Sequence, residues 1–202
     1  MNLAPADESR THSQNGEDGV LQAIFSQIGA TNRYAVEIGA GPEDCKENNT
    51  NLLKEHGWTV LQLDTQRGHR VTPANVATFL ASIPSDFDLL SIDVDGQDYW
   101  IWQAIPHRPR VVVIVYNAAL GAEVSTIVAE DEDAPTWNGS IYFGASLQAY
   151  VRLANRLGYT LVYCESSGTN AFFVRSDILA AQLFRRGFHV WPKDDRPWVA
   201  GP

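Results

Sequence analysis

Apolar and polar residues follow one another along the chain in two patterns, which predict buried strands and amphipathic helices. Short apolar runs without alternation are typical of strands that are covered on both faces of a parallel sheet. Longer segments repeat apolar residues at helical spacing. We predict strands at 34–38, 59–63, 87–92, 110–115, 159–165 and 171–175. We predict helices at 20–28, 51–56, 73–82, 147–157 and 176–186.

The order of these elements predicts one α/β domain over residues 1–202, with a doubly wound, mostly parallel sheet. Residues 1–12 lack a periodic pattern, and we expect them to form a flexible arm. The last two strands flank S-S-G-T-N, where Gly168 and Asn170 suit a tight turn, so we expect an antiparallel C-terminal hairpin. Too few residues follow Asp64 for a full crossover, so we expect the third edge strand to be reduced or missing.

Composition narrows the possible partners and the cellular compartment. The 202 residues include 24 acidic and 15 basic side chains, for a formal net charge of -9. This balance argues against nucleic acid, whose binding depends on Lys and Arg, and against anionic membrane surfaces. The two cysteines, Cys45 and Cys164, are far apart, and the first residues lack an apolar signal core. We therefore expect a soluble cytoplasmic protein, whose oligomeric state the sequence leaves open.

A glycine turn follows the first predicted strand in Y-A-V-E-I-G-A-G. Gly39 and Gly41 allow unusual backbone dihedrals and close approach of a ligand. The dinucleotide fingerprint needs a third glycine where this chain has Asp44, which disfavours a pyrophosphate cofactor. Glu37, two residues before the turn, instead suits the cationic amine and sulfonium of S-adenosylmethionine. The alternative is an ordinary strand-to-loop turn with an incidental carboxylate.

Further polar residues follow the ends of predicted strands. Asp64 ends the second strand, where nucleotide-binding sheets hold ribose hydroxyls. Asp93, Asp95 and Asn117 follow the next two strands, and such oxygen ligands suit Mg²⁺. The alternatives are an exposed Asp at position 64 and a plain strand-loop-helix junction after position 92, in which Asp98 would be the N-cap of the helix.

Residues 118–144 form a long stretch without clear periodicity, and loops of this length are usually lids or binding loops. Within it, Trp137, Tyr142 and Phe143 are expected to line a site. His69 and His107 are possible bases, ranked below Asp93 because lone histidines are more often structural.

Taken together, these stretches resemble the FkbM-like S-adenosylmethionine-dependent methyltransferases, a Rossmann-type family. The resemblance covers roughly residues 13–177 in family order. It is carried by S-Q-N-G-E-D-G-V-L, V-E-I-G-A-G, N-T-N-L-L, G-W-x-V-L-Q-L-D, L-L-S-I-D-V-D-G-Q-D-Y-W, V-V-V-I-V-Y-N, Y-F-G-A-S-L and G-T-N-A-F-F-V-R.

The resemblance implies a cofactor site and a reaction. The residues that it assigns to S-adenosylmethionine are Gln14, Glu17, Glu37, Gly39, Gly41, Asn49, Thr50, Asp64 and Asp93. Asp93 and Asn117 would be catalytic, with Mg²⁺ as a further candidate cofactor on Asp93, Asp95 and Asn117. The implied reaction is O-methylation of a small-molecule hydroxyl, with N-methylation as the less favoured outcome.

The chain departs from the family pattern at three places. Gly41 is followed by Pro42-Glu43 in place of another small residue, Val115 stands where V-V-I-E-Y-N has Glu, and the segment after Asp64 is shortened. Two rival hypotheses therefore stay open: a non-catalytic domain that binds S-adenosylmethionine, and a metal-dependent enzyme that uses Asp93, Asp95 and Asn117 without this cofactor.

Overall fold

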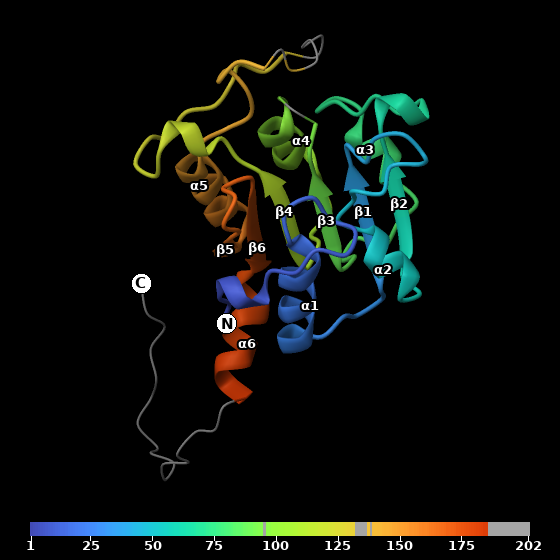
Figure 1. Cartoon of the computed structure of the whole chain (residues 1–202), viewed down its shortest axis with the longest axis vertical. Helices are drawn as coiled ribbons and strands as arrows, with labels where there is room; N and C mark the ends of the chain where they lie inside the picture. The colour runs from blue at the N-terminus through green and yellow to red at the C-terminus, as the bar shows by residue number, and fades with distance from the viewer. Residues whose placement is uncertain (95, 132–136, 138, 186–202) are drawn as a thin grey trace, which may run out of the picture.

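A computed structural model describes residues 1–94, 96–131, 137 and 139–185, and within these ranges six strands form one sheet (Figure 1). The strands are β1 (Tyr34–Ile38), β2 (Thr59–Leu63), β3 (Leu89–Ile92), β4 (Val111–Val115), β5 (Tyr159–Cys164) and β6 (Asn170–Arg175). The α-helices are α1 (Glu17–Ile28), α2 (Asn51–Glu55), α3 (Val76–Phe79), α4 (Asp98–Ala104), α5 (Leu147–Leu157) and α6 (Ser176–Arg185). Three short 3-10 helices are η1 (Pro5–Asp7), η2 (Thr65–Arg67) and η3 (Ala118–Leu120).

The sheet has the order β2-β1-β3-β4-β6-β5. Strands β1 to β4 are parallel to one another, whereas β6 is antiparallel to both β4 and β5. The predicted doubly wound, mostly parallel sheet with an antiparallel C-terminal hairpin is confirmed. Residues 69–71 form no strand, so β2 is an edge of the sheet and the third edge strand is missing.

Helices cover both faces of the sheet and enclose two hydrophobic clusters. Val36, Leu90 and Val112 belong to one cluster with residues of α3, α4 and α5. Their neighbours Ala35 and Val111 point to the other face, where α1, α2 and α6 pack. Apolar side chains on both faces explain why these strands read as continuous apolar runs.

Several element bounds differ from the prediction at the ends. Helix α5 has the predicted range, because the Ser146 hydroxyl accepts from the Ala149 N–H at 3.3 Å and Gly158 ends the helix. Helix α3 covers only part of 73–82, since the Asn75 side chain accepts from the Thr72 N–H and holds the preceding residues in a turn. Within the described residues, no helix is both long and apolar enough to span a bilayer.

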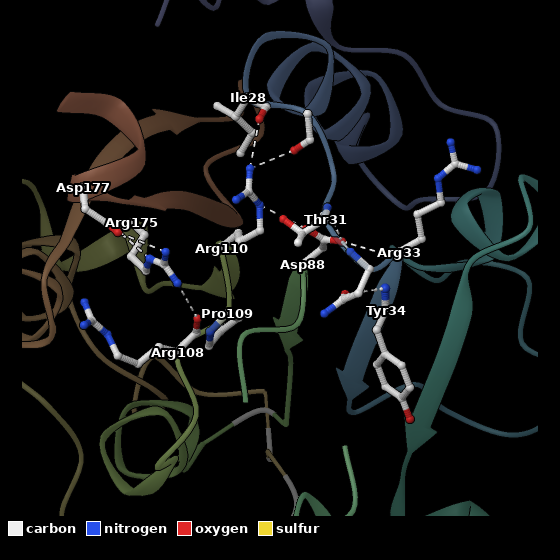
Figure 2. A network of polar contacts seen from close by, with 12 residues as sticks. Ile28, Thr31, Arg33, Tyr34, Asp88, Arg108, Pro109, Arg110, Arg175 and Asp177 are labelled. Atoms are coloured by element: carbon white, nitrogen blue, oxygen red, sulfur yellow. Dashed lines mark hydrogen bonds and ion pairs between the residues drawn. The ribbon is translucent and has the colours of Figure 1, made fainter. Parts of the chain in front are cut away.

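A polar network lies at the amino ends of β3 and β4 (Figure 2). The Asp88 carboxylate is fully buried and accepts from the backbone N–H groups of Thr31, Asn32 and Arg33. It also pairs with Arg110, whose Nε lies 3.1 Å from Asp88 Oδ1. This network fixes the loop between α1 and β1 at the edge of the sheet opposite to the strands' carboxyl ends.

The N-terminal arm of residues 1–12, for which we predicted flexibility, makes specific contacts. A Cβ at Gly19 of α1 would lie 2.1 Å from the Asp7 carbonyl oxygen, so the arm packs directly on that glycine. Glu8 accepts from the Tyr163 hydroxyl at 2.6 Å and from the Ser166 N–H at 2.8 Å. These contacts attach the arm to α1 and to the β5–β6 hairpin, and its flexibility in solution stays a prediction.

Candidate active site

A polar cleft lies at the carboxyl ends of β1 and β3, the edge where open α/β sheets bind ligands. It contains about 300 Å³ of empty space, part of it open to solvent. Its lining residues are Gln14, Glu17, Glu37, Gly39, Glu47, Asn48, Asn49, Asp93 and Asn170. The cleft therefore brings together six of the predicted cofactor-binding residues, which come from the arm side of α1, the glycine turn, the loop before α2 and the end of β3.

Gly39 is required by the neighbouring strand. Its φ is 93°, and a Cβ there would lie 1.6 Å from the Asp93 carbonyl oxygen. The Asp93 N–H donates to the Ile38 carbonyl at 2.8 Å, which draws the end of β3 against the turn. We predicted glycine here for the approach of a ligand, and the structure shows that the Asp93 backbone carbonyl itself lies too close to position 39 for a Cβ.

The Glu37 carboxylate is buried and holds the start of α2 on the sheet. It accepts from the Asn49 N–H at 2.8 Å, from the Thr50 hydroxyl, and from the Gln62 amide at 3.3 Å. Burial raises the pKa of Glu37, and these hydrogen bonds only partly oppose the rise. Thr50, a predicted cofactor ligand, therefore lies behind Glu37 and does not line the cleft.

The Glu17 carboxylate is fully buried and joins three parts of the chain. It accepts from the Asn15 N–H at 2.7 Å and from the Asn170 Nδ2 at 2.6 Å. Asn170 begins β6, and because β6 is antiparallel to β4, its first residue lies at the carboxyl end of the parallel strands. We predicted Asn170 only as a turn residue, and its position in the cleft was not predicted.

Glu47 and Asn48 are also lining residues that the sequence analysis missed. Arg10 of the arm lies 2.6 Å from the Glu47 carboxylate, an exposed pair at the rim of the cleft. A second contact joins His12 and Glu55 at 2.9 Å, so the arm is linked to the segment around α2 at two places. The polar run K-E-N-N before α2 is the sequence feature that could have predicted this part of the site.

Asp64 and Gly41 lie outside the lining of this cleft. Asp64 Oδ1 accepts from the Gln66 N–H at 2.7 Å and so caps η2. Arg67 then donates to the Gly41 carbonyl at 2.6 Å and to the Pro42 carbonyl at 2.8 Å. The turn after Asp64 is thereby tied to the glycine turn.

The predicted metal set is only partly assembled in the described residues. Asp93 lines the cleft, Asp95 lies outside the described residues, and Asn117 does not line the cleft. The Asn117 amide donates to the Ile141 carbonyl at 2.8 Å, while its buried Oδ1 has no hydrogen-bond partner among the described residues. In the described part of the chain, no group of three or more His, Cys, Asp or Glu side chains could hold a metal. Magnesium binding stays a prediction.

Asp98 is the first residue of α4, and Gln97 is its N-cap. The Asp98 carboxylate accepts from the Val94 N–H at 2.8 Å and from the Gly96 N–H at 2.9 Å. It therefore shapes the loop after β3, so its role is structural, as the junction hypothesis expected, although it is not the N-cap that we predicted.

The aromatic and histidine candidates are not part of this cleft either. Trp137 and Tyr142 are 45% and 69% exposed on the loop before α5. His69 and His107 pack against the rings of Phe79 and Phe87, respectively. Both histidines have a buried Nδ1 that lacks a hydrogen-bond partner in the part of the chain that the structure describes, and neither lines the cleft.

Comparison with known proteins yields a distant structural likeness. No family model matches the chain, and no curated protein matches it. Among solved structures, the chain is similar to the MycE methyltransferase from the mycinamycin biosynthetic pathway, solved in complex with Mg and SAH. The identity is 14% and the TM-score 0.48, over 85% of this chain and 51% of that one. The chain thus spans about half the length of that protein.

Proposed function

We propose that this protein is an S-adenosylmethionine-dependent methyltransferase that acts on a hydroxyl group of a small molecule. The observation that carries the proposal is a group of three carboxylates beside the Gly39 turn. Glu17 and Glu37 are buried, Asp93 is half-buried, and together they surround one small cleft at the carboxyl ends of β1 and β3. A cationic ligand offsets the cost of keeping such charges away from water, and this cofactor carries both an ammonium and a sulfonium.

Within this proposal, the carboxylates bind different parts of the cofactor. Glu17 and Glu37 bind the ammonium, and Asp64 accepts hydrogen bonds from the ribose hydroxyls. Asp64 Oδ2 accepts no hydrogen bond from any described residue, which leaves it available for that role. Arg67 would have to leave or share its contacts with Gly41 and Pro42 when the nucleoside binds.

When bound, the cofactor supplies a methyl group on a positively charged sulfur. Asp93, at the end of β3, is the proposed acceptor of the hydroxyl proton, because it lines the cleft and lies next to the glycine turn. Asn117 fixes the loop before α5 through its bond to the Ile141 carbonyl. Holding the cofactor and the substrate hydroxyl in a fixed relative position lowers the activation barrier of methyl transfer, because the reaction then needs no random encounter in solution.

A thermal-shift screen tests the proposal. Native-state ligands raise the melting temperature by mass action. S-adenosylmethionine and S-adenosylhomocysteine should raise it, whereas NAD and FAD should leave it unchanged. Each nucleotide is tested with and without Mg²⁺. A shift with Mg²⁺ alone, and none with either adenosyl compound, would favour the metal-dependent enzyme instead.

The second candidate function is a domain that binds the cofactor without transferring its methyl group. The observation that favours it is Val115, which is 8% exposed and apolar at a position where the family pattern has a carboxylate. Methyl transfer from labelled S-adenosylmethionine to a panel of hydroxylated acceptors separates the two. Binding with no transfer to any acceptor, under conditions where the chain is folded, would favour the binding domain.

A further inference from the structure

Asn48 is a buried side chain at the cleft whose amide nitrogen has no partner among the described residues. The residue is 4% exposed and belongs to the loop between the glycine turn and α2. Its Nδ2 is buried and makes no hydrogen bond with any residue that the structure describes. Buried donors are nearly always paired, so an unpaired one beside a cleft indicates a ligand or an ordered water.

The charges around Asn48 define what that ligand is. The cleft contains the carboxylates of Glu17, Glu37 and Asp93, and none of the described residues that line it is a Lys or Arg. Glu47 is paired with Arg10 at the rim. Carboxylates together with a neutral amide donor match a zwitterion, because its ammonium can bind the acids while its carboxylate accepts from the Asn48 amide.

We propose that Asn48 recognises the α-carboxylate of the cofactor's amino-acid end, and so makes the cleft selective for an intact α-amino acid. The inference rests on the proposed function, since it assumes that an adenosyl amino acid is the ligand. Without the amide donor, an anionic group placed among Glu17 and Asp93 would meet only repulsion. Asn48 is therefore a specificity residue, while the acids supply the attraction for the ammonium.

Three ligands that differ only at this end test the inference. S-adenosylhomocysteine has the ammonium and the carboxylate, its decarboxylated analogue keeps the ammonium, and 5′-methylthioadenosine has neither. Calorimetry on the wild-type chain should give an affinity for S-adenosylhomocysteine about tenfold higher than for the decarboxylated analogue. This comparison needs no variant, so it stands even if a substitution at position 48 impairs folding.

Asn48→Leu removes the donor and keeps the branched shape of the side chain. It should weaken S-adenosylhomocysteine about tenfold and leave both other ligands unchanged. Asn155→Leu is the matched control, because Asn155 is exposed on α5 and does not line the cleft. The control should leave the ratios among the three ligands at their wild-type values.

The outcomes separate this inference from the proposed function. If 5′-methylthioadenosine and S-adenosylhomocysteine bind equally well to the wild-type chain, the inference is wrong and the nucleoside site stands. Equal weakening of all three ligands by Asn48→Leu, or no weakening of any, would also overturn it, the latter because a water then satisfies the amide. If none of the three binds, the proposed function fails and the inference with it.

Discussion

Two residues at the end of β1 carry the architecture of the site, and each can be tested alone. Gly39 lets the Asp93 carbonyl approach the turn, and Glu37 joins the sheet to the start of α2. Both residues were predicted from the sequence to bind a ligand, and the structure shows that each also has a structural role. The following two predictions distinguish the structural role from the binding role.

Gly39→Ala should lower the free energy of unfolding by more than about 4 kcal/mol, because the new Cβ cannot coexist with the Asp93 carbonyl. Gly121→Ala is the control. Gly121 also has a positive φ, 75°, but no atom of another described residue lies within 4 Å of its Cβ position, so the expected loss is about 1–2 kcal/mol. Urea unfolding measures both, and equal losses would contradict the close-approach explanation.

Glu37→Gln should have opposite effects on stability and on binding. Because the folded-state pKa of Glu37 is raised, its contribution to stability is present at low pH and declines as the pH rises through that pKa. The neutral amide should therefore make the free chain more stable than wild type at neutral pH. The affinity for S-adenosylhomocysteine should rise with pH in the wild type and stay flat in the variant. Calorimetry across acidic to neutral pH measures this, and identical pH profiles would refute the role of Glu37 in binding the ammonium.

Two ion pairs link elements at the amino edge of the sheet, and they differ in burial (Figure 2). Asp88 is fully buried against Arg110, whereas the Asp177 side chain is 62% exposed beside Arg175. Asp88→Asn should cost about 3–5 kcal/mol, because it leaves the buried guanidinium without its counter-charge. Asp177→Asn should cost less than about 1 kcal/mol. Chemical denaturation of both variants checks the contrast, and a small loss for Asp88→Asn would mean that the loop before β1 is held by other contacts.

The arm and α1 form a second unit whose packing depends on one glycine. In a helix interior, Gly→Ala usually stabilises by about 1 kcal/mol. Gly19→Ala should instead displace the arm, since its Cβ would lie 2.1 Å from the Asp7 carbonyl oxygen. Hydrogen exchange of the backbone amides at 11–13, which donate to the Asp18 carboxylate, should become faster in this variant. Unchanged exchange would show that the arm does not depend on this contact.

For the whole molecule, local pattern was enough to predict the fold but only part of the site. The apolar runs, glycine turns and helix spacing predict the strand order along the chain and the hairpin, because each is a property of neighbouring residues. Helix α5 has the predicted bounds since its Ser146 and Gly158 caps are adjacent to it in sequence. The predicted bounds of α3 were wrong, because the Asn75 side chain determines where the helix begins, and the spacing of apolar residues does not.

The missed residues of the cleft are those placed by contacts between distant segments. Asn170 reaches Glu17 across 153 positions of sequence because β6 runs antiparallel to its neighbours. Asn48 is buried by a loop fold that the K-E-N-N run does not specify. Asp88, a fully buried charge, was read as part of an apolar strand, because its partners Thr31 and Arg110 are far from it in the chain.

The central claim is that an adenosyl compound binds at the carboxyl ends of β1 and β2, with its charged end among the cleft carboxylates. Titration calorimetry of S-adenosylhomocysteine into the wild-type chain and Asp64→Ala tests this most directly. We predict saturable binding of one molecule per chain, weakened by about 1–3 kcal/mol when Asp64 is removed. No binding heat from the wild-type chain at millimolar ligand, with the protein folded, would contradict the account.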